Sequence, residues 1–91
     1  MMENTVIKIP YIYDDTKFHT LTLTEVEDEY LFMPAESWMP LQLTYDDKDN
    51  IFAFDTDGMG QMRSRGDEIG GKKITDIRFV EGKGLIVTMK S

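Results

Sequence analysis

Cysteine is absent from this chain of 91 residues. The protein therefore cannot form a disulfide framework, supply a thiolate nucleophile or hold zinc through cysteine. The chain also lacks any run approaching the roughly 20 consecutive apolar residues of a membrane span, and no basic segment precedes the short apolar stretch near its N-terminus. We expect a soluble, cytoplasmic protein with no membrane partner.

Histidine is nearly absent as well. His19 is the only one, and its alternation with Leu21 and Leu23 predicts a position at the margin of the core and not in a catalytic triad. None of the serines lies in a G-x-S-x-G pattern. We therefore expect no enzymatic activity and no cofactor.

Basic residues are scarce in the first two thirds of the sequence. Residues 1–60 have a charge balance of −10 and residues 61–91 one of +3, which together give the net charge of −7. An acidic protein repels phosphate backbones and attracts basic surfaces. The expected partner is a basic protein surface, and direct binding to nucleic acid is not expected. The alternative is that the acids only maintain solubility.

The residues that are present favour β-strands. Apolar and polar residues alternate with the period of a half-buried strand in KFHTLTLTEV and in LQLTY, and NIFAFD is typical of a further strand. In TVIKIPYIY, Pro10 places the predicted strand at an edge or a bulge. The sequence predicts a single β-rich domain, residues 1–91, that folds as an all-β, mainly antiparallel barrel or β-roll of about 6–8 short strands with at most one short helix.

The C-terminal segments KKITDIRFV and KGLIVTMK flank Glu81-Gly82 and predict a β-hairpin near the centre of the sheet. A two-residue turn at Glu81-Gly82 would set the apolar side chains on two faces. One face would carry Ile77, Phe79 and Ile86, and the other would carry Val80, Leu85, Val87 and Met89.

One segment, TEVEDEYLFM, could instead form a helix. Thr24 and Glu27 have the spacing of a capping box. The segment is short, however, and offers no clean apolar stripe. We predict a strand, an acidic turn at Glu27 to Glu29 and a second strand.

The stretch FDTDGMGQMRSRG resembles half of a calcium loop, because Asp55 and Asp57 precede Gly58. Ala53 stands where a third ligand is needed, and no distal glutamate follows, so an EF-hand is excluded. Asp55 and Asp57 remain weak metal candidates, together with the aspartates near position 47. The glycines lack the lysine and the helix of a phosphate loop. A tight hairpin turn at Asp57-Gly58 explains the stretch without a ligand.

The only tryptophan, Trp38, lies between Met33-Pro34 and Met39-Pro40. Tryptophan on a Pro-bounded connection with adaptable methionine neighbours suits an interface anchor. The alternative is that Trp38 folds back as a lid on the open end of the barrel.

Three hypotheses of function follow. The first is a protein that binds and occludes a basic site on a partner, in the manner of an inhibitor, an immunity protein or a phage counter-defence protein. The second is a structural domain that forms a homodimer through an exposed strand edge. The third is a metal-dependent or hydrolytic activity at the Asp cluster. We favour the first hypothesis, with these candidate partner-binding residues: Glu25, Glu27, Asp28, Glu29, Trp38, Asp46, Asp47 and Asp49.

Overall fold

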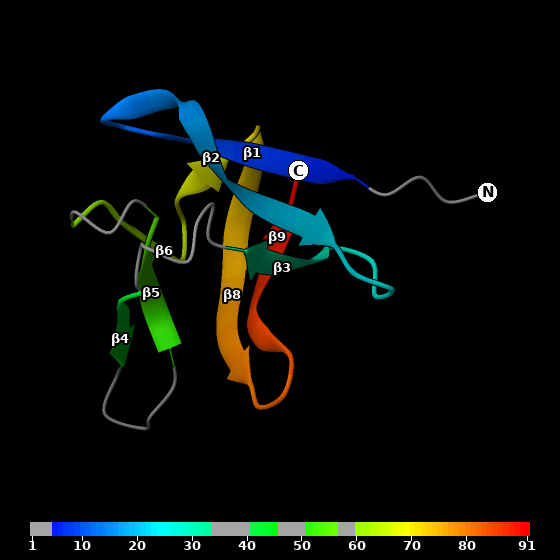
Figure 1. Ribbon diagram of the computed structural model, residues 1–91. Helices are drawn as coiled ribbons and strands as arrows, with labels where there is room; N and C mark the ends of the chain where they lie inside the picture. Colours follow the sequence, from blue (N-terminus) through cyan, green and yellow to red (C-terminus); the bar gives the residue numbers. More distant parts are fainter. Residues whose placement is uncertain (1–4, 34–40, 46–50, 57–59) are drawn as a thin grey trace.

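A computed structural model describes residues 5–33, 41–45, 51–56 and 60–91, whose strands form two antiparallel sheets (Figure 1). The larger sheet has the order β1 (Val6–Tyr11), β2 (Asp14–Leu23), β3 (Glu29–Met33), β9 (Gly84–Lys90), β8 (Lys72–Val80) and β7 (Glu68–Ile69). The smaller sheet has the order β4 (Leu43–Tyr45), β5 (Ile51–Asp55) and β6 (Met62–Ser64). Within these ranges there is no helix, and so none that could cross a membrane. The predicted all-β antiparallel fold is confirmed.

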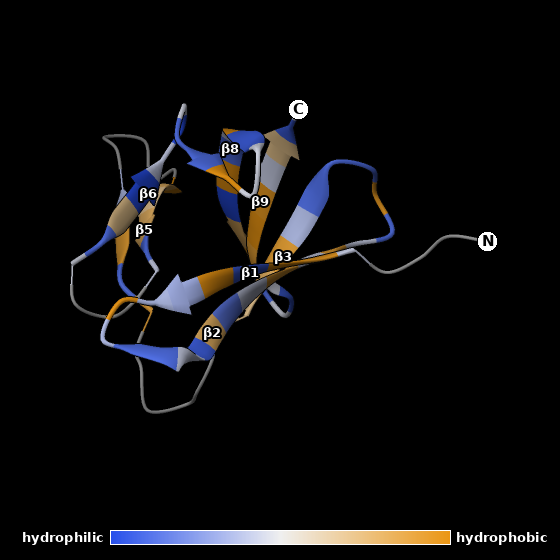
Figure 2. Cartoon of the chain, turned by 90° about the horizontal axis from the view of Figure 1, so that it is seen from above, coloured by the Kyte–Doolittle hydropathy of each residue, from blue (hydrophilic) through white to orange (hydrophobic). Residues whose placement is uncertain are grey.

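The six-stranded sheet curls into a nearly closed barrel. Strands β1 and β7 lie at opposite ends of the strand order, and yet Gly70, which follows β7, lies directly against Ile7 of β1. Seen from above, the strands of this sheet curve around one side of the molecule, and β5 and β6 lie beside them (Figure 2). The curvature gives the sheet an inner face, on which Leu21, Val87 and Met89 are fully buried.

The small sheet packs on the barrel through β5. Phe54 is fully buried, and its ring lies 4.9 Å from the ring of Phe32 in β3, in an edge-to-face arrangement. His19 of β2 also packs against Phe32, with ring centroids 5.6 Å apart. At 1% exposure His19 belongs to the core itself, deeper than the marginal position that its alternation pattern predicts.

Pro10 occupies the free edge of the barrel sheet, as predicted. The amide of Leu23 donates to the carbonyl of Thr5, so the odd-numbered residues of β1 direct their backbone groups towards β2. The even-numbered residues direct their backbone groups away from β2. Pro10, which has no N–H group, lies at one of these even-numbered positions. The register also shifts between Pro10 and Tyr11, where the β1–β2 pairing has a bulge or irregularity.

The C-terminal hairpin is central, as predicted, since β9 lies between β3 and β8. The predicted assignment of its two faces is wrong. Val80 pairs with Gly84 across three turn residues, so Arg78 and not Ile77 lies opposite Ile86. A turn one residue longer than Glu81-Gly82 moves every side chain of β9 to the other face relative to β8. Leu85, Val87 and Met89 therefore share the inner face with Ile77, and Ile86 faces outward.

The predicted two-residue turn at Asp57-Gly58 falls on residues outside the described part of the chain. The strands on either side of it do pair, but Asp55 lies opposite Met62 and Phe54 opposite Arg63. The amide of Thr56 donates to the carbonyl of Gln61 at 3.0 Å. This register belongs to a longer connection, because a two-residue turn would place Thr56 opposite Met59.

Candidate binding site on the outer face of the sheet

The acidic segment between β2 and β3 is a turn, as predicted, and it begins at Glu25. The Thr24 hydroxyl accepts a hydrogen bond from the Val26 amide at 3.0 Å, and the Thr24 amide donates to the Glu29 carbonyl at 2.8 Å. The Glu29 amide donates to the Val26 carbonyl at 3.1 Å. Thr24 therefore closes a turn, where the capping-box alternative would have made it the start of a helix. Glu29, which was expected in the turn, is the first residue of β3.

Asp28 gives the turn its shape. It has a φ of 67°, the one positive value among the described non-glycine residues, and aspartate tolerates this region better than most residues because its short side chain can bond locally. Its position two residues after Val26 is the one that requires positive φ in a type II turn. The Asp28 carbonyl also accepts a hydrogen bond from the Met89 amide at 2.8 Å, which ties the turn to β9.

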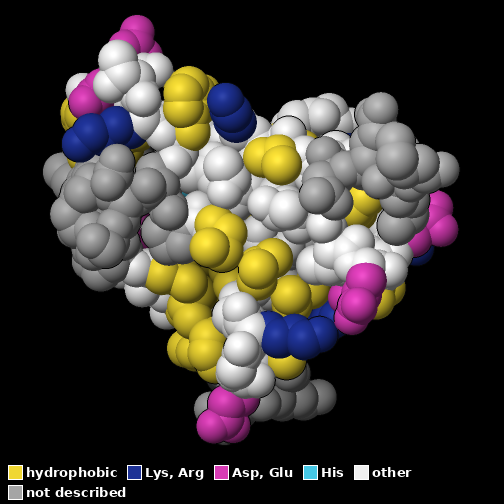
Figure 3. All heavy atoms as spheres, turned by 45° about the vertical axis from the view of Figure 1, so that its right-hand side comes forward, with side chains coloured by type: hydrophobic (Ala, Val, Ile, Leu, Met, Phe, Trp, Pro, Cys, Tyr) yellow, Lys and Arg dark blue, Asp and Glu magenta, His cyan; other side chains and the backbone are white. Residues whose placement is uncertain are grey.

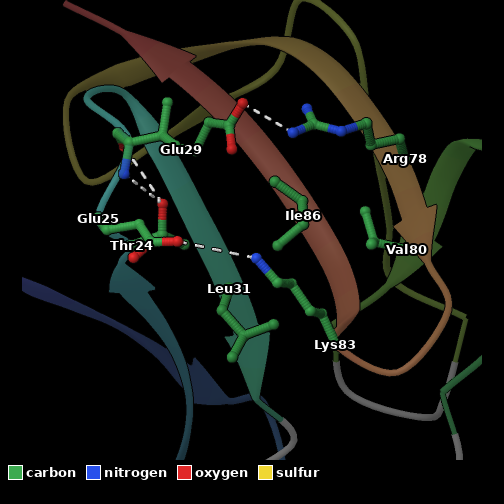
Figure 4. A pocket seen from close by; sticks show the side chains of 9 residues that line it. Thr24, Glu25, Glu29, Leu31, Arg78, Val80, Lys83 and Ile86 are labelled. Atoms are coloured by element: carbon green, nitrogen blue, oxygen red, sulfur yellow. Dashed lines mark hydrogen bonds and ion pairs between the residues drawn. The ribbon is translucent and has the colours of Figure 1, made fainter.

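An open cavity of about 450 Å³ lies between this turn and the β8–β9 turn (Figure 4). Its floor consists of outward-facing side chains on three adjacent strands, with Leu31 opposite Ile86 and Ile86 opposite Arg78. Ile86 is only 3% exposed, and Val80 and Val26 extend the apolar surface. The volume lies within the range of roughly 300 to 1,000 Å³ that is typical of ligand pockets.

One side of the cavity is held by a chain of ion pairs. The Arg78 guanidinium lies 2.7 Å from the Glu29 carboxylate and 3.6 Å from that of Asp76. Asp76 in turn lies 3.7 Å from Arg65. Charges alternate along this chain, so this side of the cavity is electrically balanced.

The other side, between the two turns, is open and acidic. Glu25 and Lys83 face each other there at 3.9 Å, with side chains 85% and 65% exposed. An exposed pair of this kind contributes only about 0 to 1 kcal/mol. Glu27 and Asp28 make no ion pair with any described residue, and Glu81 of the β8–β9 turn makes none either. The two turns beside the cavity therefore carry more acidic groups than the single base Lys83 can balance.

The acidic residues at the two ends of β2 do not form one surface. Asp14 and Asp15 begin the strand, and the Glu25–Asp28 turn follows its end. A ten-residue strand is roughly 30 Å long at about 3.3 Å per residue. Asp14 accepts hydrogen bonds from the amide and the hydroxyl of Thr16, at 3.0 and 2.6 Å, and these bonds hold the pKa of its carboxyl below the ordinary range.

The structure assigns Asp55 a role within its own loop. Asp55 is buried, and its carboxylate accepts a hydrogen bond from the Gly60 amide at 3.1 Å. Among the residues that the structure describes, no three His, Asp or Glu side chains gather where they could hold a metal ion. The other metal candidate, Asp57, lies outside the described residues.

Four of the eight predicted partner-binding residues are found together at the cavity. Glu25 and Glu29 line it, and Glu27 and Asp28 complete the same turn. The remaining four lie outside the described residues: Trp38, Asp46, Asp47 and Asp49. The two alternatives for Trp38, an interface anchor and a lid on the barrel, therefore both remain predictions.

The sequence interpretation missed the apolar and basic part of the site. Val80 and Ile86 were assigned only to opposite faces of the hairpin, Leu31 was left unassigned, and Arg78 and Lys83 were not considered. A signal for them exists in the alternation of β8, because Arg78 stands between Ile77 and Phe79 and marks an outward position. Ile86 joins that outward row only when the turn length is known.

Hydrophobic side chains also gather in a continuous patch on one face of the surface, with acidic and basic side chains at its border (Figure 3).

A comparison of the chain with protein-family models, curated proteins and solved structures finds no match. The interpretation of the site accordingly depends on its geometry and charge.

Proposed function

We propose that this protein is a non-enzymatic cytoplasmic binding protein that occludes a basic site on a partner protein. The observation that carries the proposal is the position of the acidic Glu25–Asp28 turn beside an apolar cavity on the outer face of the sheet. Protein interfaces combine an apolar centre with a polar rim, and this site has both.

The charge of the molecule supports a basic partner. A net charge of −7 attracts a basic protein over long distances and increases the association rate at low ionic strength. At the site itself, Glu27 and Asp28 make no ion pair with any described residue, so their carboxylates are available to a partner.

The position of His19 supports a non-enzymatic role. This residue is the only histidine of the chain, and it is 1% exposed beside Phe32. A general base must come within hydrogen-bond reach of its substrate. A side chain enclosed in the core in this way does not meet that requirement without a rearrangement of the barrel.

The homodimer hypothesis is less favoured, at least through the free edge of β1. Lys8 and Pro10 lie on the outward-directed positions of this strand. A lysine and a proline at an edge both oppose pairing with another strand.

The test compares the acidic turn with an equal loss of charge elsewhere. Fluorescently labelled 12-residue peptides rich in Lys and Arg serve as basic probes, and an acidic peptide of equal length serves as the reference. Fluorescence anisotropy measures their affinity at low and at high salt. Binding of the basic probes should weaken as salt rises, and the double variant Glu27→Gln/Asp28→Asn should weaken it about threefold to tenfold at low salt.

The matched control is the double variant Asp15→Asn/Glu68→Gln, which removes the same charge at exposed positions away from the turn. It should reduce affinity less than twofold. If both double variants weaken binding equally, the acids act only through net charge, and the proposed site is wrong. If the basic peptides bind no better than the acidic one, the function is wrong as well.

A further inference from the structure

We propose that the cavity binds an aliphatic side chain of the partner protein, while a neighbouring Arg or Lys of the same partner segment binds the carboxylates of the Glu25–Asp28 turn. This inference rests on the proposed function and specifies the chemistry that the site recognises. The partner segment carries an aliphatic residue beside a basic one.

The aliphatic part of the inference follows from the floor. Leu31 and Ile86 lie in register on adjacent strands, and Val80 lies on the next strand, so their side chains form one continuous apolar surface. Val26 of the turn also lines the cavity and is 49% exposed. A partner side chain placed here would remove several partly exposed apolar groups from water at the same time.

A missing side chain contributes to the depth of the floor. Gly84 lies next to Val80 in the β8–β9 pairing, and the nearest atom to a Cβ at this glycine would be Leu31 Cδ1, at 3.5 Å. The φ of Gly84 is +116°, a conformation that side chains other than glycine rarely adopt. The backbone thus keeps this part of the outer face free of a side chain between two apolar neighbours.

The placement of the cation follows from the two unequal sides of the cavity. Arg78 is held by Glu29 at 2.7 Å and by Asp76 at 3.6 Å, so the carboxylates on that side already have a base. Across the mouth, Lys83 and Glu25 are 3.9 Å apart and well exposed. An incoming cation can replace Lys83 as the partner of Glu25 at small cost, since exposed pairs are weak.

The charge around the mouth selects a cation over an anion. The two turns beside the cavity carry Glu25, Glu27, Asp28 and Glu81, with Lys83 as the one base in these turns. An anionic partner group would meet several unpaired carboxylates, whereas a cationic group would be attracted by them.

The experiment uses the whole protein and two peptides of equal length and charge. One peptide alternates Arg with Leu, and the other alternates Arg with Ser. We expect the Arg/Leu peptide to bind at least fivefold more tightly. In methyl NMR spectra it should shift the signals of Val26, Leu31, Val80 and Ile86, while that of buried Leu21 remains in place.

Two double variants locate the contact. Val26→Thr/Val80→Thr keeps the β-branched shape of the cavity lining but makes it polar, and it should remove the preference for the Arg/Leu peptide while leaving the Arg/Ser affinity unchanged. Val6→Thr/Ile12→Thr changes two exposed apolar residues elsewhere and should leave the preference intact. Thermal unfolding of both variants verifies that they fold.

The possible outcomes separate this inference from the proposed function. If the two peptides bind equally, and Glu27→Gln/Asp28→Asn still weakens both, the cavity has no aliphatic ligand and the function stands. If neither peptide binds better than the acidic reference, both fail. If hexylammonium shifts the four methyl signals and the Arg/Leu peptide does not, the site takes a small amphipathic cation, and the inference of a partner segment is overturned.

Discussion

Gly70 and Ile7 meet where the two ends of the six-stranded sheet come together. A Cβ built on Gly70 would lie 2.7 Å from Cγ2 of Ile7, closer than two carbon atoms can pack. Ile7 belongs to β1 and Gly70 to the turn between β7 and β8, so this contact joins the first and last strands of the sheet. The absence of a side chain at Gly70 lets the two ends of the sheet approach each other.

We expect Gly70→Ala to destabilise the fold more than Gly71→Ala does. Both glycines have positive φ, +60° and +82°, but a Cβ on Gly71 meets nothing within 4 Å. Gly71→Ala should cost about 1 kcal/mol from backbone strain alone. Gly70→Ala should cost a further 1 to 3 kcal/mol, roughly, from overpacking against Ile7. Urea unfolding monitored by circular dichroism measures both.

A double-mutant cycle with Ile7→Ala attributes the extra cost to this contact. In the Ile7→Ala background, the cost of Gly70→Ala should fall to that of Gly71→Ala, because the clashing methyl is gone. An unchanged cost would mean that the contact does not limit barrel closure.

The two ion pairs at the cavity should differ in strength. Glu29 and Arg78 are 2.7 Å apart and partly shielded, whereas Glu25 and Lys83 are 3.9 Å apart and exposed. A double-mutant cycle with Glu29→Gln and Arg78→Met should give a coupling energy of about 0.5 to 1 kcal/mol, and one with Glu25→Gln and Lys83→Met a value below about 0.3 kcal/mol. Equal coupling energies would contradict the proposed difference between the two sides of the cavity, on which the placement of the ligand cation depends.

Asp28 should tolerate glycine and asparagine but not alanine. Its φ of 67° is accessible to glycine, and asparagine adopts this region more readily than alanine does. Asp28→Ala should therefore lower the free energy of unfolding by about 1 kcal/mol, while Asp28→Gly is at least as stable as the wild type and Asp28→Asn close to it. Guanidinium unfolding of the three variants tests this, and equal stability of all three would show that the turn relaxes to a negative φ.

The Asp14 carboxyl should titrate at a lower pH than an ordinary aspartate. The Thr16 hydroxyl and amide donate to its charged form, which lowers its pKa in the folded state. A depressed folded-state pKa contributes stability above the unfolded-state pKa, and that contribution is lost as pH falls through the folded value. The affected window lies below about pH 4.

Substitution of Thr16 tests this interpretation. Thr16→Val removes the hydroxyl, so the Asp14 pKa should rise towards the ordinary aspartate value, and the loss of stability below about pH 4 should become less steep. NMR titration of the Asp14 carboxyl carbon provides the measurement. A pKa that does not move in Thr16→Val would assign the shift to another cause.

Alternation along the chain was sufficient to predict the longer strands and the all-β class, but not the short strand β7. Leu21 in β2 and Ile9 in β1 are both buried, and each occupies an inward position in the alternation of its own strand, as a half-buried strand requires. The absence of a helix in the acidic segment also followed from the sequence, because the segment is short and offers no clean apolar stripe.

The faces of the C-terminal hairpin could not be derived in the same way. Its two strands are apolar on both faces, so their pattern fits either register, and the choice depends on a turn of two or three residues. The observed three-residue turn moves Ile86 outward and so creates the floor of the cavity. The burial of His19 has a similar origin, since Phe32 covers it only after β2 and β3 have paired and curled.

The sequence by itself determined the longer strands, an edge or bulge position for Pro10 and the acidic turn, because each depends on the backbone and charge of neighbouring residues. Only the tertiary structure decided which carboxylates share a surface. Glu25 and Glu29 meet Lys83 and Arg78 because β9 lies between β3 and β8 and brings two distant turns together. Asp14 and Glu25 are both acidic and lie only eleven positions apart in the sequence. In the structure they are separated by the full length of an extended strand.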